Sequence, residues 1–512
     1  MARSGKDAVS GAADRGAAPT AAAAVPPDLS PAAMSGALRA ALADVEQEFT
    51  DLPLTPLGTL PADLRGVLYR NGPGRFGRGG VRYAHPFDGD GHVVRIAIGA
   101  DGVRYTNRFV RTAEYRAETA AGRMRYRGFG SNLPGGLATN LLRLHFKNAA
   151  NTNVVWQGGR LLALWEGGLP HRLDPHSLAT LGPEDFQGRL RNPLPAPARW
   201  LSPWLPFAAH PRLAADTGAM INFGVVFGRP CRLVFYRIDA DGCMAPPLLY
   251  PLPRFSFVHD FAVTRHWYCV LLPWAEFDLP RALLGLATPV GSLRLATERP
   301  MQALLIPRAG GPPRVLETVP GFVFHIAQGC EDAAGRLALD VIRYPRYPAF
   351  DDLEGLFQAA DDANLPRLER LLLDPRPGAA APCTLTPWSD RPSELPSTAP
   401  GALGAARRIV YSVGAPPGRR GPYFTAVQRL DTDNGRLQVR DFAPDLPGEP
   451  IPAGGASGED WLLTLLWRHA TRRSELLILR AADLAVQARL PLPHAVPPGF
   501  HGCWVAATPG SD

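Results

Sequence analysis

Four histidines carry the clearest chemical signal in this chain, because each stands in a similar apolar or Gly-Pro setting. They occur in Phe-Ala-Ala-His-Pro, Phe-Val-His-Asp-Phe, Phe-Val-Phe-His-Ile and Pro-Gly-Phe-His-Gly, as His210, His259, His325 and His501. No two of them have the short spacing of a zinc finger. Any one of them alone is more often a buried histidine satisfied by its neighbours. A set of four that converges would hold a metal ion through neutral imidazole nitrogens alone.

Histidines so far apart can meet only if the fold points each of them at a common axis. The 512 residues include 52 Gly and 54 Pro, which indicates many turns and few long helices. One helix is predicted over 32–48, and from Leu68 on the pattern is short strands between turns. The clearest hairpin joins 153–156 to 160–165 through Gly158-Gly159, and further strands are predicted at 255–261, 267–272 and 336–342.

A weak repeat underlies these strands. An apolar strand, a turn containing Asp and a return strand recur near His171, Phe235, Gln428 and Leu479. This unit is typical of the outer hairpin of a propeller blade. A ring of blades would turn the inner strands, and the four histidines with them, toward one axis. The sequence therefore predicts an all-β chain and favours a β-propeller.

The composition excludes several other classes of protein. The net charge of +7 is spread along the chain and no basic helix is present, so no nucleic-acid partner is expected. The six cysteines show no paired spacing, which favours reduced thiols in a cytoplasmic protein. Residues 1–31 are rich in Ala, Gly and Pro and are predicted to be a disordered tail, with an organelle transit peptide as the alternative. Residues 32–512 are predicted to form one domain.

Two apolar segments interrupt the β pattern, at 200–207 and at 277–286. One interpretation is that both pack over the core as loop and helix. The other is an exposed apolar patch that dips into a bilayer and admits a lipid-soluble substrate, which would make the protein peripherally membrane-associated.

Longer motifs identify the family that the chain resembles. Residues 66–74 read Gly-Val-Leu-Tyr-Arg-Asn-Gly-Pro-Gly, and residues 82–91 read Arg-Tyr-Ala-His-Pro-Phe-Asp-Gly-Asp-Gly. Ala-Asn-Thr-Asn at 150–153 and Trp-Glu-Gly-Gly at 165–168 follow. With the four histidine motifs, these segments resemble the carotenoid cleavage oxygenases from about residue 48 to the C-terminus. Asp88 and Asp90 are interpreted as turn formers, and His92 stands where the family usually carries an apolar residue, often Met.

The resemblance implies a seven-bladed β-propeller, with helices and loops that cap a non-haem Fe(II) on the propeller axis. The implied metal ligands are His210, His259, His325 and His501. The implied acceptors of the imidazole N–H groups are Glu166, Glu394 and Glu449. Carboxylates placed there would fix each tautomer and balance charge without occupying the metal. Thr152 matches a family position near the open coordination site.

The implied reaction is the O2-dependent cleavage of one double bond in an apolar polyene. The resemblance favours an apocarotenoid or carotenoid as substrate and a retinal-like aldehyde as product. Stilbene-cleaving members commonly carry Lys at the position of Trp165, which argues against a phenolic substrate. The isomerohydrolase branch differs at Thr152, which favours an oxygenase. The remaining alternative is a propeller that binds carotenoid without catalysis, and the four retained histidines disfavour it.

Overall fold

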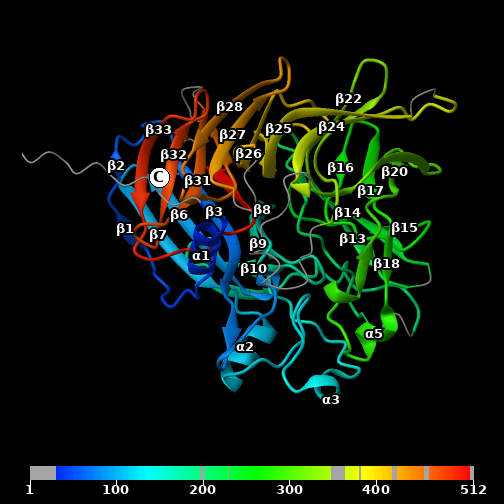
Figure 1. Ribbon diagram of the computed structural model, residues 1–512, viewed down its shortest axis with the longest axis horizontal. Helices are drawn as coiled ribbons and strands as arrows, with labels where there is room; N and C mark the ends of the chain where they lie inside the picture. Colours follow the sequence, from blue (N-terminus) through cyan, green and yellow to red (C-terminus); the bar gives the residue numbers. More distant parts are fainter. Residues whose placement is uncertain are drawn as a thin grey trace, which may run out of the picture.

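Antiparallel β-sheets make up most of the computed structural model, which confirms the expectation of a mainly β protein (Figure 1). The structure describes residues 30–196, 199, 202–228, 230–347, 364–379, 382–417, 424–454 and 460–507. All of the predicted disordered tail before Ser30 lies outside this part of the chain.

The first half of the chain forms four of the sheets. A five-stranded sheet has the order β1 (Leu52–Leu54), β7 (Gly102–Phe109), β6 (Asp90–Gly99), β3 (Gly66–Arg75) and β34 (Gly502–Ala506). Three four-stranded sheets follow in chain order. They consist of β8 (Asn153–Gln157), β9 (Arg160–Leu164), β10 (His171–Leu173) and β11 (Thr180–Pro183); β12 (Arg212–Leu213), β13 (Met220–Val226), β14 (Arg232–Ile238) and β15 (Leu248–Pro251); and β16 (Ala262–Val263), β17 (Trp267–Leu272), β20 (Pro300–Pro307) and β21 (Arg314–Pro320).

The second half forms one long run of strands and a final sheet. The long run is β22 (Phe322–Glu331), β23 (Leu337–Tyr344), β24 (Arg367–Leu373), β25 (Cys383–Ser397), β26 (Ile409–Gly414), β27 (Ala426–Asp431) and β28 (Arg436–Asp441). The final sheet is β2 (Leu57–Gly58), β33 (Val486–Pro491), β32 (Arg473–Arg480) and β31 (Asp460–Arg468), which pairs with both β29 (Leu446–Pro447) and β30 (Ile451–Gly454). Two small ribbons pair β4 (Gly77–Arg78) with β5 (Val81–Arg82) and β18 (Ala275–Phe277) with β19 (Leu293–Leu295).

The two ends of the chain exchange strands. The C-terminal strand β34 pairs with β3 and completes the first sheet. The early strand β2 pairs with β33 and completes the last sheet. A hydrophobic cluster that includes Leu68, Tyr105, Leu463 and Ile478 fills the space between these two sheets. The first and last sheets are therefore packed together as closely as sheets that are neighbours in sequence.

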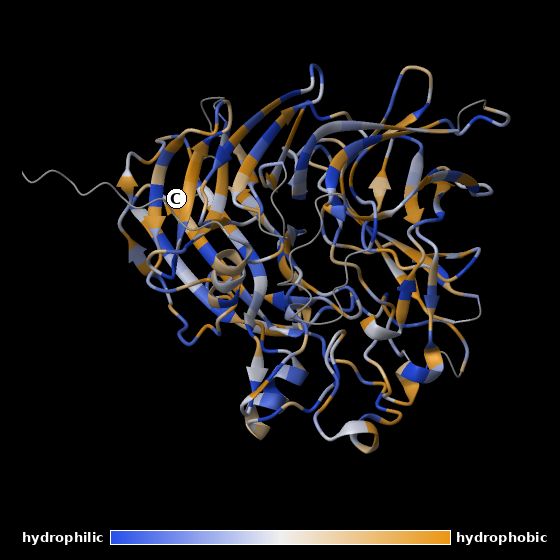
Figure 2. Ribbon diagram, in the orientation of Figure 1, coloured by the Kyte–Doolittle hydropathy of each residue, from blue (hydrophilic) through white to orange (hydrophobic). Residues whose placement is uncertain are grey.

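The other large hydrophobic clusters lie between successive sheets. Five of them join the strands of one sheet to those of the next, starting with β3 and β6 against β8 and β9 and ending with β26 and β27 against β31 and β32. The sixth packs β22, β23 and β24 against β26 and β27, the two halves of the long run of strands. Burial of these apolar side chains is the main source of stability, at about 25 cal/mol per Å² removed from water. Figure 2 shows hydrophobic residues repeated along the strands that face these clusters.

The predicted hairpins are mostly confirmed. Strands β8 and β9 pair from Asn153↔Leu164 to Gln157↔Arg160, and both glycines of the connecting turn have positive φ, 55° for Gly158 and 71° for Gly159. That conformation suits a two-residue turn between twisted strands. The repeated Asp-containing turns also join paired strands, namely β10–β11, β14–β15, β27–β28 and β32–β33.

One strand prediction and one helix prediction were wrong in part. The strand predicted at 255–261 is irregular, and only Ala262–Val263 pairs with β17. The helix predicted over 32–48 is α1 (Pro31–Ala41), and residues 43–48 are not helical. Val45 is buried and its N–H donates to the Gly74 carbonyl, so the apolar spacing serves a non-helical segment there.

The remaining helices gather on one side of the sheets (Figure 1). Among the described residues these are α2 (Ala113–Ala121), α3 (Gly136–Asn140) and α5 (Leu279–Leu283), and two 3₁₀ turns, η1 (Pro86–Asp88) and η2 (Val290–Ser292), are described as well. None of the described helices is long and apolar enough to cross a membrane. The apolar segment at 200–207 packs inward, since Leu205 and Phe207 are fully buried; Trp200 and Leu201 lie outside the described residues.

The structure gives His92 a role in the core of the first sheet. Its Nε2 lies 2.9 Å from Asn107 Nδ2, and the Phe49 N–H fixes the orientation of that amide by donating to Asn107 Oδ1. The amide NH2 therefore donates to Nε2, and His92 is neutral with its proton on Nδ1. Complete burial lowers the pKa of His92 to about 3.

Acid should destabilise the fold partly through His92. Its folded pKa lies below the unfolded value near 6.5, so the unfolded state binds more protons as the pH falls below that value. We expect the free energy of unfolding to drop by about 2 kcal/mol between pH 7.5 and pH 5 through this group, and His92→Met to remove that part of the slope. Denaturant titrations at both pH values measure it, with the exposed His176→Met as control. Equal slopes in wild type and His92→Met would contradict the assignment.

Candidate metal centre

The four histidines all lie at the beginning of strands. His210 and His259 come two and three residues before β12 and β16, which are the first strands of their sheets. His325 lies near the beginning of β22, and His501 directly precedes β34. Each of these strands lies at an edge of its sheet, and the fold brings the four imidazoles together from four separate sheets.

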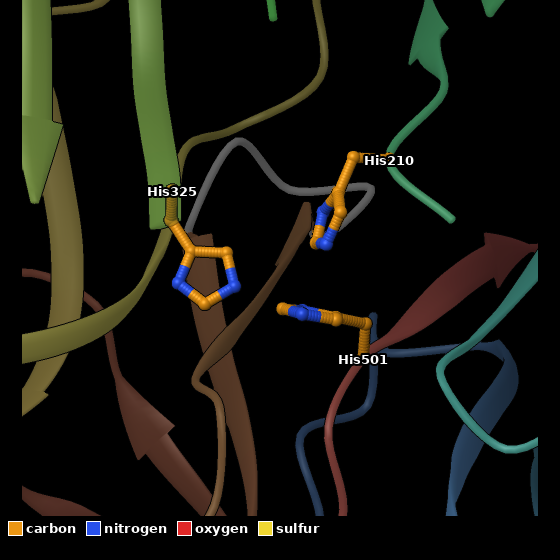
Figure 3. Close-up of side chains that lie close together, drawn as sticks. All are labelled: His210, His325 and His501. Carbon is orange, nitrogen blue, oxygen red and sulfur yellow. The ribbon is translucent and has the colours of Figure 1, made fainter. Parts of the chain in front are cut away.

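The four imidazole rings form one cluster. Nε2 of His210 lies 2.9 Å from Nε2 of His259, and the His210 ring centroid is 5.2 Å from that of His325 and 4.6 Å from that of His501. The rings of His210, His325 and His501 face one another (Figure 3). These three offer ligand atoms that all lie within 4.8 Å of one another, and within the described chain they form the group that could hold a metal ion. His259 stands outside that group of three but contacts His210 and His325, so the structure brings together all four histidines singled out in the sequence.

Three of the imidazoles donate a hydrogen bond from their Nδ1–H group to a glutamate. His259 Nδ1 lies 3.0 Å from Glu166, His325 Nδ1 lies 2.6 Å from Glu394, and His501 Nδ1 lies 2.8 Å from Glu449. A carboxylate accepts, so the proton sits on Nδ1 and the lone pair on Nε2 points into the cluster. This is the arrangement that metal-binding histidines require of their partners. The donor set therefore fits a divalent transition-metal ion.

Glu394 is placed by an irregularity in β25. The first part of β25 pairs with β24 and its end pairs with β26, and the register shifts between Glu394 and Ser397. Leu395 has a positive φ of 48° at this point. The carboxylate accepts from the Leu395 N–H at 2.6 Å and from the Tyr344 hydroxyl at 2.6 Å in addition to His325. Three donors hold Glu394 as a buried anion.

Glu449 has a different set of partners. It accepts from the Gly502 N–H at 3.1 Å and forms a buried ion pair with Arg70, while His501 donates to its other oxygen. Its side chain is 9% exposed, against 30% for that of Glu166. The three carboxylates therefore range from a buried ion pair to a partly hydrated group.

Burial and neighbouring charges shift the acidity of these groups in opposite directions. Complete burial and the other imidazoles lower the pKa of His210 well below its usual value, so this histidine stays neutral. Burial alone would lower the pKa of His325, but the Glu394 carboxylate outweighs it and raises that pKa. Burial would raise the pKa of Glu449, but His501 and Arg70 outweigh it and lower that pKa. Metal binding needs neutral imidazoles beside ionised carboxylates, so the directions at His210 and Glu449 favour it, whereas a metal ion must displace the second proton that the raised pKa of His325 favours.

The backbone of Thr152 contacts the histidine cluster. Its carbonyl accepts from the His501 N–H at 3.2 Å, and its N–H donates to the Leu164 carbonyl at 3.0 Å. The hydroxyl lies 3.2 Å from Asn151 Oδ1. The structure thus places Thr152 in direct backbone contact with His501, one of the four clustered histidines.

A network that the sequence did not reveal ties three of the histidine segments together. Asp260, directly after His259, accepts from Arg212 at 2.6 Å and from the Ile326 N–H at 2.7 Å. Arg212 also donates to the Ile326 carbonyl at 2.9 Å. Arg212 lies two residues after His210, and Ile326 directly follows His325. The His-Asp pair at 259–260 was the available signal, because a carboxylate next to a ligand is placed to order its neighbours.

Asp88 and Asp90 are more than turn formers. The Asp90 carboxylate forms buried ion pairs with Lys147 at 2.6 Å and with Arg78 at 2.7 Å. Asp88 accepts from the N–H of Phe129 at 2.6 Å and so holds the loop at 128–131 against η1. Both carboxylates fix the loops that precede the Thr152 segment.

Comparison with known proteins agrees with this geometry. The model of the retinal pigment epithelial membrane protein family matches residues 42–506. The apocarotenoid-15,15'-oxygenase of Synechocystis is 36% identical over 464 residues, which cover 87% of this chain and 91% of that protein. The chain belongs to the carotenoid cleavage oxygenase family.

Other oxygenases are also similar to the chain. The resveratrol cleavage oxygenase 1 of Aspergillus fumigatus is 27% identical over 480 residues, covering 88% of this chain and 91% of that protein. A solved structure of cobalt-substituted Synechocystis apocarotenoid oxygenase superposes with a TM-score of 0.84 at 34% identity, covering 92% of this chain and 99% of that chain. The fold shared with this solved structure therefore includes nearly the whole of this chain.

Proposed function

We propose that this carotenoid cleavage oxygenase is an Fe(II)-dependent dioxygenase that cleaves one carbon–carbon double bond of an apocarotenoid or carotenoid to give retinal-like aldehydes. The observation that carries the proposal is the cluster of four imidazoles, three of which donate to buried or half-buried glutamates. The similarity to the Synechocystis apocarotenoid-15,15'-oxygenase supports the substrate class.

Each side chain has a stated task in this proposal. The residues that would hold the iron are His210, His259, His325 and His501, through the nitrogen that faces the cluster. Glu166, Glu394 and Glu449 hold the Nδ1 protons and keep each ring in its ligand orientation. Bound Fe(II) would supply the activation of O2, and four protein ligands would leave room on the ion for it. Thr152, whose carbonyl accepts from the His501 N–H, would restrict what fits beside the ion.

The apolar polyene requires a dry, aromatic environment, and the rings beside the cluster supply it. Phe500, which precedes His501, lies 5.3 Å from Phe87, and Phe87 lies 6.5 Å from Phe129. From Phe129 the rings continue through Phe257 to Phe322 at separations of 6.3 and 6.0 Å. Such a row offers ring faces and edges to a conjugated chain and excludes water from the metal side.

The domain that carries the site is proposed to be a seven-bladed β-propeller over residues 32–512. Counted with the long run of strands divided at Glu394, where β25 passes from one partner strand to the next, the large sheets number seven. The hydrophobic clusters between successive sheets, and the one between the last sheet and the first, support a ring. A ring places the histidines of several blades on one axis.

The reaction is tested by anaerobic reconstitution with Fe(II), followed by an apocarotenal in detergent under ¹⁸O-labelled O2. We expect two shorter carbonyl products that depend on iron and carry the label. An isomerised but uncleaved substrate would indicate an isomerohydrolase. Cleavage of a stilbene phenol in preference to the polyene would show that the substrate is a stilbene. A bound, unchanged pigment in the iron-loaded protein would contradict catalysis.

Peripheral membrane contact is proposed for the apolar tips of α3 and α5. Leu142 is 65% exposed and Leu286 is 55% exposed, and the Leu142 N–H donates to the Leu283 carbonyl, which joins the two tips. Arg143 is exposed within the same patch, and residues 136–144 contain no acidic side chain. An apolar patch with exposed basic residues suits an anionic bilayer surface.

Making the tips polar should weaken this contact. For the pair Leu142→Ser and Leu286→Ser, we expect roughly a tenfold or larger loss of binding to phosphatidylglycerol-containing vesicles, because two large side chains no longer leave water. Vesicle flotation measures it. The matched control is Leu181→Ser, which removes a 59% exposed leucine from β11. Equal binding by both variants would contradict the patch.

A further inference from the structure

One buried arginine contacts the proposed iron site from outside the histidine and glutamate set. Arg70 lies in β3 and is 3% exposed. It forms an ion pair with Glu449 and donates to the Phe500 carbonyl at 3.1 Å, so it touches both the partner of His501 and the residue before it. Nothing in the roles assigned above uses this cation.

The three carboxylates differ in how their negative charge is met. Glu394 receives hydrogen bonds from a hydroxyl and a backbone N–H, which are neutral donors. Glu166 is partly exposed to solvent. Glu449 alone of the three has a buried guanidinium against it, among the contacts of the described residues. A charge buried at such a position has an effect on a nearby ion that solvent does little to screen.

We propose that Arg70 is a positioning residue that matches the site's charge to a divalent ion. Four neutral imidazoles contribute no charge, and the adjacent Arg212–Asp260 pair cancels. The three glutamates contribute three negative charges and Arg70 one positive charge, which leaves two negative charges, equal in size to the charge of Fe(II). Without Arg70 the surplus negative charge favours the trivalent ion. This inference rests on the proposed function, because it requires that the site holds iron.

The test compares ferric with ferrous iron in the full-length protein. A redox titration followed by the high-spin ferric EPR signal gives the midpoint potential, and anaerobic Co(II) titration gives the metal stoichiometry. For Arg70→Gln we expect the ratio of ferric to ferrous affinity to rise at least tenfold, which is about 59 mV lower in potential for one electron. Arg70→Lys keeps the charge and should stay near wild type.

Two further variants separate charge from packing. Glu449→Gln together with Arg70→Gln restores two net negative charges, so its potential should return toward the wild-type value, although both partners have been altered. Arg78→Gln removes another buried guanidinium, paired with Asp90 at 2.7 Å, and should not move the potential. If Arg70→Gln fails to fold, the double variant and Glu449→Gln alone, which should raise the potential, carry the test.

The outcomes are distinct. A lower potential in Arg70→Gln that the double variant reverses supports the inference. An unchanged potential in Arg70→Gln, an equal shift in Arg78→Gln, or a double variant that falls further overturns it while leaving the metal site intact. Wild-type protein that binds no Co(II) would overturn the proposed function and this inference with it.

Discussion

Replacing His325 with alanine is expected to abolish stoichiometric metal binding and turnover while the sheets remain folded. The His325 ring lies 5.2 Å from that of His210, 5.3 Å from that of His259 and 5.1 Å from that of His501, so it belongs to the centre of the cluster. A lost ligand should reduce metal affinity by more than the roughly 10- to 100-fold typical of a lost outer hydrogen bond. The fold should survive because Glu394 keeps the Tyr344 and Leu395 donors.

The measurement is metal content after anaerobic reconstitution and dialysis, together with circular dichroism and thermal unfolding. His171→Ala is the matched control, since His171 is also a buried histidine but lies in β10, away from the cluster. We expect it to alter stability and to leave metal content at one ion per chain. A His325→Ala protein that keeps one iron and wild-type turnover would show that the ligand assignment is wrong.

Much of the site was predictable because its residues sit in long local motifs. The four histidines have apolar sequence neighbours, as expected of residues near the beginning of strands that face a core. The structure brings all four together. Glu166 follows Trp165 in a short turn after β9, which places it by local geometry. Such signals survive in the sequence because they depend on a few adjacent residues.

The long-range partners were not predictable, because their signal lies in contacts between distant segments. Arg70 and Glu449 are separated by 379 positions and meet beside β34, which pairs with β3 and whose first residue, Gly502, donates its N–H to Glu449. Asp260 ties together three histidine segments through the backbone of Ile326. A single sequence gives no information on which of many arginines or aspartates reaches such a place.

Secondary structure failed where tertiary contacts override local spacing. Residues 255–261 alternate like a strand, but Phe257 and Val258 face aromatic and apolar clusters beside the metal site rather than a neighbouring strand. The helical spacing beyond Ala41 was misleading for the same reason, since the Gly74 carbonyl takes the Val45 N–H. In both segments, contacts between an irregular backbone and the core override the periodic spacing of apolar residues.

The three glutamates are expected to differ in importance when each is replaced by glutamine. Glu394 accepts from three donors, and a glutamine has only one acceptor oxygen, so its NH2 group would face a buried N–H or O–H. Such a buried mismatch costs more than a lost hydrogen bond. We expect Glu394→Gln to weaken metal binding by about 100-fold, at the upper end of the range for residues that orient a ligand.

Glu166→Gln should weaken metal binding by only about tenfold, the lower end of the same range. Both of its oxygens approach the same His259 Nδ1, at 3.1 and 3.0 Å, so an amide can turn its single oxygen to that N–H. The side chain is 30% exposed, and water can solvate the NH2 group. Competition with a chelator for Co(II) measures both variants, and Glu369→Gln, a buried glutamate paired with Arg343, is the control. If Glu166→Gln proved the more damaging of the two, burial and donor number would not be what ranks these carboxylates, and the partly hydrated position would have to act directly on the metal's open side.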